Sequence, residues 1–317
     1  MVSTNTPIMK AIRFHEYGGF EVLKYENVPR PEPQPSEVLI QVRAASVNPF
    51  DLALREGWLA SMIPLQLPAI AGVDVAGIVM ATGEGVTDFS IGQDVYGFMS
   101  RYTGAYAEYA SVARETIAPQ PQTLDYVQAA SVPLAATAAW QALFEVGGLK
   151  ERQKVLVHGG AGGVGTFAVQ LAKLKGAHVL ATTVGQNVEY VQRLGADEVI
   201  DYPVTPFETV AHAVDVVLDL VGGETQQRSW RVLKAGGILV SLREPPSQED
   251  AATYGVRAAF VGAQPSSSLL KELAELLDRG QIKPHVDKVF PLEQARQAQE
   301  LKRNGHIQGK IVLKIAD

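Results

Sequence analysis

The sequence predicts an α/β protein with two domains, a doubly wound parallel sheet in the centre of the chain and a mostly β domain around it. A chain of 317 residues is long enough for about two domains. From residue 154 onward, short apolar runs alternate with amphipathic segments, which is typical of βαβ units and a parallel sheet. Residues 8–130 show instead short β-branched runs separated by glycine and proline.

The N-terminal region is expected to be a series of strands joined by turns. The expected strands span residues 8–18, 37–47, 73–83, 91–98 and 104–112. The proline-rich stretch 29–35 lies between two of them and is interpreted as an extended connector. Five aromatic residues follow, namely Tyr96, Phe98, Tyr102, Tyr106 and Tyr109. They could line a flat apolar pocket or fill the core, and both interpretations stay open.

The pattern changes near residue 126. Residues 125–143 are alanine-rich with helical periodicity, and Pro133 should divide them into two helices. The segments that follow are predicted as strands at 174–184, 197–202, 214–223 and 238–242, with helices at 187–196 and 224–237. An amphipathic helix is expected at 266–282. Residues 285–315 then give strand, helix and strand, which would return the chain to the first domain.

A glycine cluster between an apolar run and a helix, within residues 154–173, predicts a dinucleotide site. Gly160, Gly162 and Gly165 occupy the positions of a G-x-G-x-x-G motif. The first glycine is expected to permit the tight turn, the second to let a pyrophosphate approach the backbone, and the third to let the helix pack closely. The phosphates would bind the free N–H groups at the start of that helix, so Gly163 and Val164 join the candidates.

The composition of the chain argues against several classes of function. A net charge of −6 gives no basic footprint for nucleic acid or an anionic membrane. The chain has no cysteine, so disulfides and thiolate metal sites are excluded. Neither a signal peptide nor a stretch long enough to span a membrane is visible, and we expect a cytoplasmic protein.

Nine segments in order resemble the medium-chain dehydrogenase/reductase superfamily, specifically its zinc-free quinone oxidoreductase branch, which includes zeta-crystallin. They are MKAIRFHEYGG, AASVNPFDLALREG, GVDVAGIV, GAYAEYA, ATAAWQAL, HGGAGGVG, LGADEVIDY, VLDLVGG and HIQGKIVLKI. The resemblance implies a GroES-like, partly open β-barrel domain built from both ends of the chain, and a central Rossmann domain. We expect the first at residues 1–128 and 266–317 and the second at 129–265.

The zinc ligands of related alcohol dehydrogenases are missing. Zinc-dependent members carry a cysteine after the second strand and a Gly-His-Glu further on. This chain has Asn48-Pro49 and Gly72-Val73-Asp74 at those places, and it lacks the cysteine-rich structural lobe. Catalytic zinc needs about three N, S or O ligands, so no metal is expected.

The resemblance implies hydride transfer from a reduced nicotinamide to a quinone or an α,β-unsaturated carbonyl. Asn48, in the family's NPxD motif, is the first candidate to hold the substrate oxygen or the nicotinamide ribose, and an Asx turn before Pro49 is the alternative. Asp51 is expected to cap a helix. Thr137 matches a family threonine beside the nicotinamide, although such a hydroxyl can also bond its own helix. Relatives often carry Tyr or Lys two residues after the Asp; this chain has Ala53, so we expect the proton to come from solvent.

NADPH is favoured over NADH, because residues 182–187 contain no acid to bind the adenosine ribose. Thr182 and Thr183 could bind a 2′-phosphate, and Tyr202 matches a family tyrosine near it, but Gln186 or Asn187 replaces the family's lysine. Four further candidates, placed near the nicotinamide by family position, are Val221, Gly222, Leu242 and Phe260.

Other functions stay open. The missing lysine and Ala53 are compatible with an NADPH-binding structural or sensor protein with little turnover. An enoyl-thioester reductase is a further alternative, although no basic cluster for a carrier lies near the NPxD motif. The acceptor itself cannot be identified, since loops such as 55–68 would select it. Relatives commonly dimerise through the edge of the Rossmann sheet, so residues 258–263 would pair in a homodimer.

Overall fold

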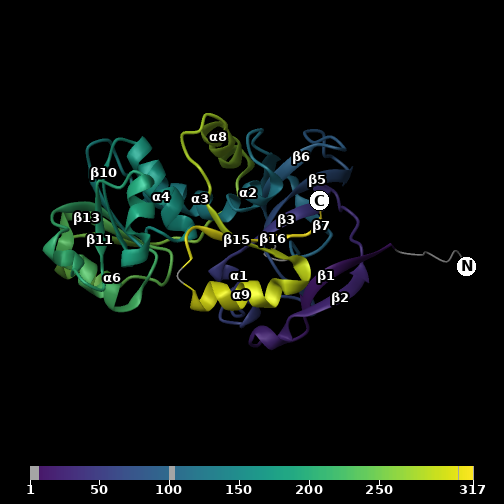
Figure 1. The fold of residues 1–317 in the computed structure, drawn as a ribbon, viewed down its shortest axis with the longest axis horizontal. Coiled ribbons are helices and arrows are strands. Elements are labelled where there is room, and N and C mark those ends of the chain that lie inside the picture. Colours follow the sequence, from purple (N-terminus) through teal and green to yellow (C-terminus); the bar gives the residue numbers. More distant parts are fainter. Residues whose placement is uncertain (1–6, 100–103, 306, 317) are drawn as a thin grey trace, which may run out of the picture. The chain divides into compact units, whose positions relative to one another are not determined.

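The computed structural model describes residues 7–99, 104–305 and 307–316, and the chain divides into two compact units. The first, here called the barrel unit, comprises Met1–Leu134, Pro265–Asp278 and Val286–Asp317. The second, the Rossmann unit, comprises Ala135–Gln264 and Arg279–His285. The α/β fold with a GroES-like barrel and a parallel-sheet domain, expected from the sequence, is confirmed (Figure 1).

The Rossmann unit is built on a parallel sheet with the strand order β11-β10-β9-β12-β13-β14. Its strands are β9 (Lys154–His158), β10 (His178–Thr183), β11 (Glu198–Asp201), β12 (Val214–Asp219), β13 (Leu233–Ser241) and β14 (Arg257–Phe260). Its α-helices are α4 (Gly163–Leu174), α5 (Val188–Arg193), α6 (Gly223–Ser229) and α7 (Gln248–Thr253). Short η turns span Gly185–Asn187 (η4), Phe207–Thr209 (η5) and Trp230–Val232 (η6). The predicted alternation of strands and helices is therefore present. The helix expected at 224–237 is shorter than predicted, because α6 ends at Ser229 and residues 233–237 belong to β13, where Leu233 pairs with Val214.

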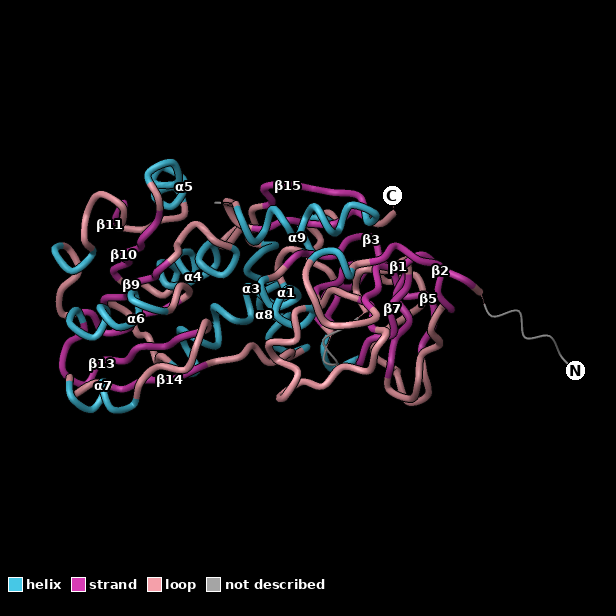
Figure 2. Tube along the Cα trace, turned by 90° about the horizontal axis from the view of Figure 1, so that it is seen from below, coloured by secondary structure: helices cyan, strands magenta, loops and turns pink. Residues whose placement is uncertain are grey.

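Burial explains the strand patterns of this sheet. Helix α4 packs against β9 and β10, and α5 packs against β10 and β11. The central strand β12 is almost wholly buried, as expected for an apolar run in a parallel sheet covered by helices. Figure 2 shows β9 and β10 side by side with α4 next to them.

Pro133 divides the alanine-rich stretch as predicted. Helix α2 (Tyr126–Ala130) ends before it, and α3 (Pro133–Trp140) begins with the proline itself, where a missing N–H has no cost. The chain continues as a π-helical turn, η3 (Gln141–Val146), which packs against β12 and β13.

The barrel unit contains two sheets. One has the order β2-β1-β4; the other has the order β15-β16-β3-β5-β6-β8, with β7 also paired to β3. The strands are β1 (Ile8–Phe14), β2 (Lys24–Pro29), β3 (Glu37–Val47), β4 (Ala69–Ile70), β5 (Asp74–Thr82), β6 (Asp94–Phe98), β7 (Tyr109–Ala113), β8 (Ile117–Pro119), β15 (Val286–Pro291) and β16 (Lys310–Lys314). The helices and turns are η1 (Phe20–Val22), α1 (Pro49–Arg55), η2 (Arg114–Thr116), α8 (Ser267–Asp278), η7 (Leu292–Gln294) and α9 (Ala295–Asn304).

The C-terminal part returns to the barrel unit by strand pairing. Strand β16 is antiparallel to β3, with Ile311 opposite Val47, and parallel to β15. This pairing places Lys310 next to the end of β3 and the start of α1, although more than two hundred residues separate them in the sequence.

The aromatic cluster is mainly core. Tyr96, Phe98 and Tyr106 are completely buried in the barrel unit, so the pocket interpretation is wrong for these three. Tyr109 is partly exposed and lines a cavity. Tyr102 lies outside the described residues.

No helix in the described part of the chain is both long enough and apolar enough to cross a membrane.

Candidate functional site

The candidate cofactor residues gather at one edge of the Rossmann sheet, where its strands end. Neighbouring strands finish in register, with Thr182 beside His158, Thr183 beside Asp201 and Ser241 beside Phe260. Strand order reverses between β9 and β12, and open α/β sheets bind ligands outside the carboxyl ends of their strands at such a point. The glycine loop after β9 lies against Val221, the second residue after β12.

Glycine is required at the three motif positions for different physical reasons, and the reason at Gly160 differs from the prediction. The left-handed residue of the turn is Gly159 (φ +76°), so the role assigned to Gly160 belongs to its neighbour. Gly160 is required by packing instead, since a Cβ there would lie 2.9 Å from the Cβ of Ala181. At Gly165 a Cβ would lie 2.2 Å from the carbonyl oxygen of Gly159, so only glycine lets α4 approach the loop.

The start of α4 is open toward an anion. Gly162 is its N-cap and no side chain caps the helix. Gly163, Val164 and Gly165 form the first turn, whose N–H groups have no partner within the helix. A cradle of backbone donors without side chains, at the positive end of a twelve-residue helix, fits the diphosphate of a dinucleotide.

Thr182 and Thr183 lie at the end of β10, and both are buried. The Thr182 hydroxyl is already engaged, with His158 Nδ1 at 3.2 Å and as acceptor from the Gly159 amide at 3.2 Å. It therefore holds the glycine loop against the end of β10. His158 also contacts Ser229 Oγ at 2.9 Å, and burial lowers the pKa of His158 to about 4.

An acidic residue that the sequence analysis missed lies beside the turn after β10. Asp201 ends β11, and its Oδ2 would be 2.8 Å from a Cβ on Gly185. No hydrogen-bond partner among the described residues reaches its buried Oδ1. Tyr202 follows it and is 52% exposed. The end of the edge beside β10 and β11 thus combines an exposed phenol with a carboxylate, which a search of residues 182–187 alone could not find.

The sequence analysis also missed the carboxylate of Asp219 at the end of β12, which fixes the turn that follows this strand. Its Oδ1 accepts the amides of Val221 (3.0 Å) and Gly222 (2.9 Å), and its backbone oxygen accepts the amide of Leu242 (3.0 Å). Gly222 has φ +81°, as a tight turn requires. Val221 and Phe260 are about half exposed, so two apolar side chains remain accessible here. An acidic residue at the end of an apolar strand, followed closely by Val-Gly-Gly, is the sequence pattern that could have identified Asp219.

Thr137 lies in α3 and is completely buried. Its hydroxyl has no hydrogen-bond partner among the described residues, so it does not bond its own helix. A buried hydroxyl without a partner is costly. This orphaned group fits a role in binding the carboxamide or ribose of a nicotinamide.

Asn48 lies in a buried polar network of the barrel unit. It is the N-cap of α1, and the Asp51 amide donates to its backbone oxygen at 3.0 Å. Its Nδ2 donates to Asp74 Oδ2 (2.9 Å) and more weakly to Ser46 Oγ (3.4 Å), and its Oδ1 accepts from the Lys310 ammonium. Asp74 also accepts from Ser46 Oγ, from Lys310 Nζ (3.3 Å) and from the amide of Leu134 (2.9 Å). Every oxygen of Asp74 is thus satisfied, and one buried amine neutralises it.

Asp51 caps α1 as predicted, because its Oδ2 accepts the backbone amide of Asn48 at 2.8 Å. The same oxygen accepts the Tyr106 hydroxyl at 2.9 Å, while Oδ1 is buried with no partner among the described residues. Burial raises the pKa of Asp51 to about 7, and the nearby Asp74 adds to the rise. The Asn48 amide, the Tyr106 hydroxyl and Lys310 oppose it.

The donors present do not fit zinc. Where zinc-dependent relatives place cysteine and histidine, this chain has Asn48 and Val73, and the neighbouring carboxylate of Asp74 is bound by the Lys310 amine. In the described part of the chain no group of three His, Cys, Asp or Glu side chains is arranged to hold a metal ion.

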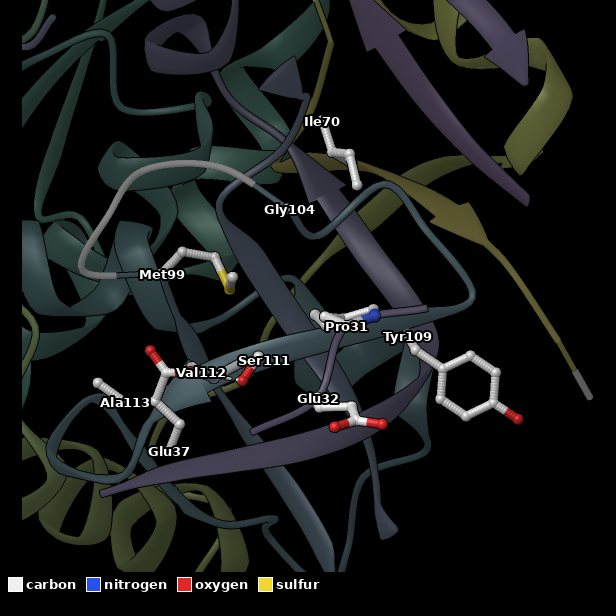
Figure 3. Close-up of a pocket in the computed structure, with 11 residues that line it drawn as sticks. Pro31, Glu32, Glu37, Ile70, Met99, Gly104, Tyr109, Ser111, Val112 and Ala113 are labelled. Carbon is white, nitrogen blue, oxygen red and sulfur yellow. Dashed lines mark hydrogen bonds between the residues drawn. The ribbon is translucent and has the colours of Figure 1, made fainter. Parts of the chain in front are cut away.

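A separate cavity of about 310 Å³ lies in the barrel unit, and it contains none of the candidate residues. Its walls include Ile70, Met99 and Tyr109, and Glu37 accepts a hydrogen bond from Ser111 at 2.7 Å (Figure 3).

Two family models match the chain. The model described as "Alcohol dehydrogenase GroES-like domain" matches residues 34–122. The model described as "Zinc-binding dehydrogenase" matches residues 194–313.

Known proteins are similar over nearly the whole chain. The mitochondrial NAD(P)H oxidoreductase RTN4IP1 of Mus musculus is 34% identical, with 99% of this chain and 91% of the relative covered. The chloroplastic NADPH-dependent alkenal/one oxidoreductase of Arabidopsis thaliana is 35% identical, with 96% and 79% covered. The solved structure of the quinone oxidoreductase from Coxiella burnetii is 36% identical, covers 98% of this chain and 100% of that chain, and has a TM-score of 0.91.

Two of these relatives are named as organellar, so the cytoplasmic location stays a prediction. The collinear markers, the fold and the similarity over the full length agree: the chain belongs to the medium-chain dehydrogenase/reductase superfamily, in its zinc-free, quinone oxidoreductase-like branch, and is an oxidoreductase that works with a nicotinamide cofactor.

Proposed function

We propose that this protein is a zinc-independent reductase that transfers hydride from NADPH to a quinone or an α,β-unsaturated carbonyl. The observation that carries the proposal is the uncapped start of α4, enclosed by glycines that leave only backbone donors, at the reversal point of the sheet. The similar quinone and alkenal/one oxidoreductases support the acceptor class.

NADPH is the proposed cofactor. The end of β10 offers no acid of its own, and Tyr202 is exposed beside Thr183, whose carbonyl accepts the Tyr202 amide at 3.1 Å. The similar alkenal/one oxidoreductase is named as NADPH-dependent. Asp201 opposes this choice, because a carboxylate near the ribose repels a 2′-phosphate. We therefore expect a modest preference for NADPH over NADH.

The chain's own residues would divide the work. The first-turn amides of α4 bind the diphosphate, the hydroxyl of Thr137 binds the nicotinamide half, and Asp219 holds the Val221–Gly222 turn in place. When bound, the reduced nicotinamide supplies the hydride. Asn48 is proposed to bind the acceptor's oxygen through the N–H that makes only the 3.4 Å contact to Ser46.

Conjugation spreads the charge that develops on a quinone or enone, so one or two donors suffice to stabilise it. Lys310, which contacts the Asn48 carbamoyl oxygen, adds positive charge to that group and strengthens its N–H as a donor.

The proposal is tested by following NADPH oxidation by the purified protein in the presence of simple quinones and enones. Reduction of either class supports it, and no turnover with any acceptor would count against it. Tight NADPH binding without turnover would favour a sensor or structural protein, for which Ala53 and the missing phosphate-binding lysine argue. Reduction of a crotonyl thioester in preference to quinones would favour an enoyl-thioester reductase.

The proposed assembly is a homodimer that pairs the edge strand β14. Among the described strands it pairs only with β13, so it is an edge strand of the sheet. Light scattering on the purified protein tests this. A charged substitution such as Ala259→Glu on β14 should yield monomers.

A further inference from the structure

The carboxylate of Asp219 is buried at the ligand edge of the Rossmann sheet without a cation beside it. It ends β12 and is completely buried. Its Oδ1 accepts the amides of Val221 at 3.0 Å and Gly222 at 2.9 Å. Its Oδ2 accepts hydrogen bonds from Gln226 Nε2 at 2.9 Å and Ser241 Oγ at 3.0 Å. All four donors are neutral, and no Lys or Arg in the described part of the chain forms an ion pair with this group.

The hydrogen-bond pattern requires the ionised form of this carboxylate. Ser241 Oγ already accepts the amides of Arg243 at 3.2 Å and Glu244 at 3.3 Å, so its own hydrogen is donated to Asp219. Gln226 Nε2 also donates to the Glu244 carbonyl at 3.3 Å, which identifies it as the donor end of that amide. Asp219 therefore faces donors on both oxygens, and a protonated carboxyl would have no acceptor for its O–H.

His158, at the end of the neighbouring strand β9, does not supply the missing positive charge. Burial lowers the pKa of His158 to about 4, although the Asp219 carboxylate opposes this shift. The imidazole is therefore neutral at pH 7. The side chain of Arg243 is exposed, so solvent screens its charge. A buried charge without a counter-ion is costly to keep in a fold, which indicates that this one has a role at the site.

The turn that Asp219 holds belongs to the candidate cofactor edge. Val221 lies 3.7 Å from the position that a Cβ would take on Gly159 in the glycine loop. The backbone oxygen of Asp219 accepts the Leu242 amide at 3.0 Å, so this residue joins the turns that follow β12 and β13. The proposed function assigns the nicotinamide half of the cofactor to these turns, which puts the ring beside the buried charge.

We propose that the negative charge of Asp219 favours the oxidised, positively charged nicotinamide over the reduced, neutral one, and this rests on the proposed function. Hydride transfer removes two electrons and one hydrogen from the ring, which gains a positive charge, and the acceptor gains a negative one. A fixed negative charge in a medium of low dielectric stabilises the positive charge on the ring. Asp219 thereby makes the bound cofactor a stronger hydride donor than it is in water.

The affinities of the two redox forms measure this effect without turnover. Oxidised and reduced cofactors share the same diphosphate and adenosine, so a change in those parts of the site alters both dissociation constants by the same factor. A change of charge beside the ring alters their ratio. Fluorescence titration gives Kd for NADPH, and calorimetry gives Kd for NADP⁺, with no acceptor present.

In Asp219→Asn we expect the ratio of Kd for NADPH to Kd for NADP⁺ to fall about tenfold, because NADP⁺ loses the stabilisation. This fall equals about 30 mV in the potential of the bound two-electron couple. NADH and NAD⁺ should show the same change, and 2′,5′-ADP, which lacks the ring, should bind as it does to the wild type. Asp215→Asn removes a carboxylate near the opposite end of β12, where Lys234 pairs with it, and should leave the ratio unchanged.

Gln226→Lys neutralises the charge without changing Asp219, and it serves if Asp219→Asn does not fold. Its ammonium would replace the Nε2 that lies 2.9 Å from Asp219 Oδ2, so the ratio should fall in the same direction. Gln226→Met removes the same hydrogen bond and adds no charge, so it is the matched control and should keep the ratio of the wild type. Thermal unfolding of each variant shows whether it is folded.

An unchanged ratio in folded Asp219→Asn or in folded Gln226→Lys would overturn the proposal. A fall of equal size in Gln226→Met would also overturn it, because the network would then act by its shape and not by its charge. A wild type that binds none of the four nucleotides would instead overturn the proposed function, and with it the inference that rests on it.

Discussion

The two regions that carry the candidate site are built in opposite ways. At the edge of the Rossmann sheet the candidate binding groups are backbone amides, and glycines such as Gly162 and Gly165 leave them free of side chains. Around Asn48 in the barrel unit the groups are side chains, and buried charge is neutralised between β3, β5 and β16.

The two regions therefore tolerate different kinds of substitution. A backbone site depends on space, so adding one carbon atom damages it. A side-chain network depends on charge balance in a medium of low dielectric, so a change of one proton or one charge damages it. The four predictions below use that distinction, in order of expected effect.

Gly165→Ala should have the largest effect. Its Cβ would lie 2.2 Å from the Gly159 oxygen, so the loop must move, and we expect NADPH affinity to fall by at least about 100-fold, or about 2.7 kcal/mol. Fluorescence titration measures it. Gly262→Ala, where nothing lies within 4 Å of the new Cβ, should bind normally.

If Gly165→Ala is unstable, Gly162→Ala separates binding from folding, because its Cβ meets only the Gly159 oxygen at an ordinary 3.4 Å. That variant should have the same melting temperature as the wild type but should bind NADPH more weakly. Normal binding by both variants would mean that the loop does not hold the diphosphate.

Asp51→Asn should change how stability depends on pH. Burial raises the pKa of Asp51 from 3.8 to about 7, so the folded state keeps a proton that the unfolded chain releases near pH 4. The resulting stability is complete below pH 4 and is lost as pH rises to 7, by up to about 4 kcal/mol. The amide does not titrate, so the variant should compare more favourably with the wild type at pH 8 than at pH 5.

Urea unfolding at both pH values measures this difference. Glu84→Gln, an exposed carboxylate of the same unit, is the control and should show no such trend. Equal effects of Asp51→Asn at pH 5 and pH 8 would show that the carboxyl is ionised throughout.

Lys310→Met should destabilise the protein by about 3 kcal/mol, because Asp74 would remain buried without its cation. Adding Asp74→Asn should restore part of that loss, and urea unfolding of both single variants and the double variant gives the coupling. Strictly additive losses would argue that the amine does not neutralise Asp74.

Asp201→Asn should have the smallest effect, confined to cofactor choice. Removing one charge near Gly185 should raise the ratio of kcat/KM for NADPH to that for NADH by about tenfold, or about 1.4 kcal/mol. Glu189→Gln, exposed on α5, serves as the comparison. An unchanged ratio would place the ribose away from Asp201.

Local patterns predicted much of the Rossmann unit. The alternation of strands and helices, the break at Pro133 and the glycine motif are all encoded over short stretches, and all three are present, although residues 233–237, expected to be helical, belong to β13. Within that motif, the prediction assigned the tight turn to Gly160. When two glycines are consecutive, the sequence does not show which one adopts the left-handed conformation, and in the structure it is Gly159.

The sequence by itself determined the fold class, the candidate dinucleotide edge and the lack of zinc ligands, because each depends on neighbours along the chain or on residue types that are absent. Tertiary structure alone decided that Lys310 neutralises Asp74 beside Asn48, that Asp201 lies at Gly185 and that the Thr137 hydroxyl has no partner among the described residues. The physical reason is sheet register: β16 pairs with β3, and β11 with β10, and only that pairing brings together charges whose separation along the chain carries no local signal.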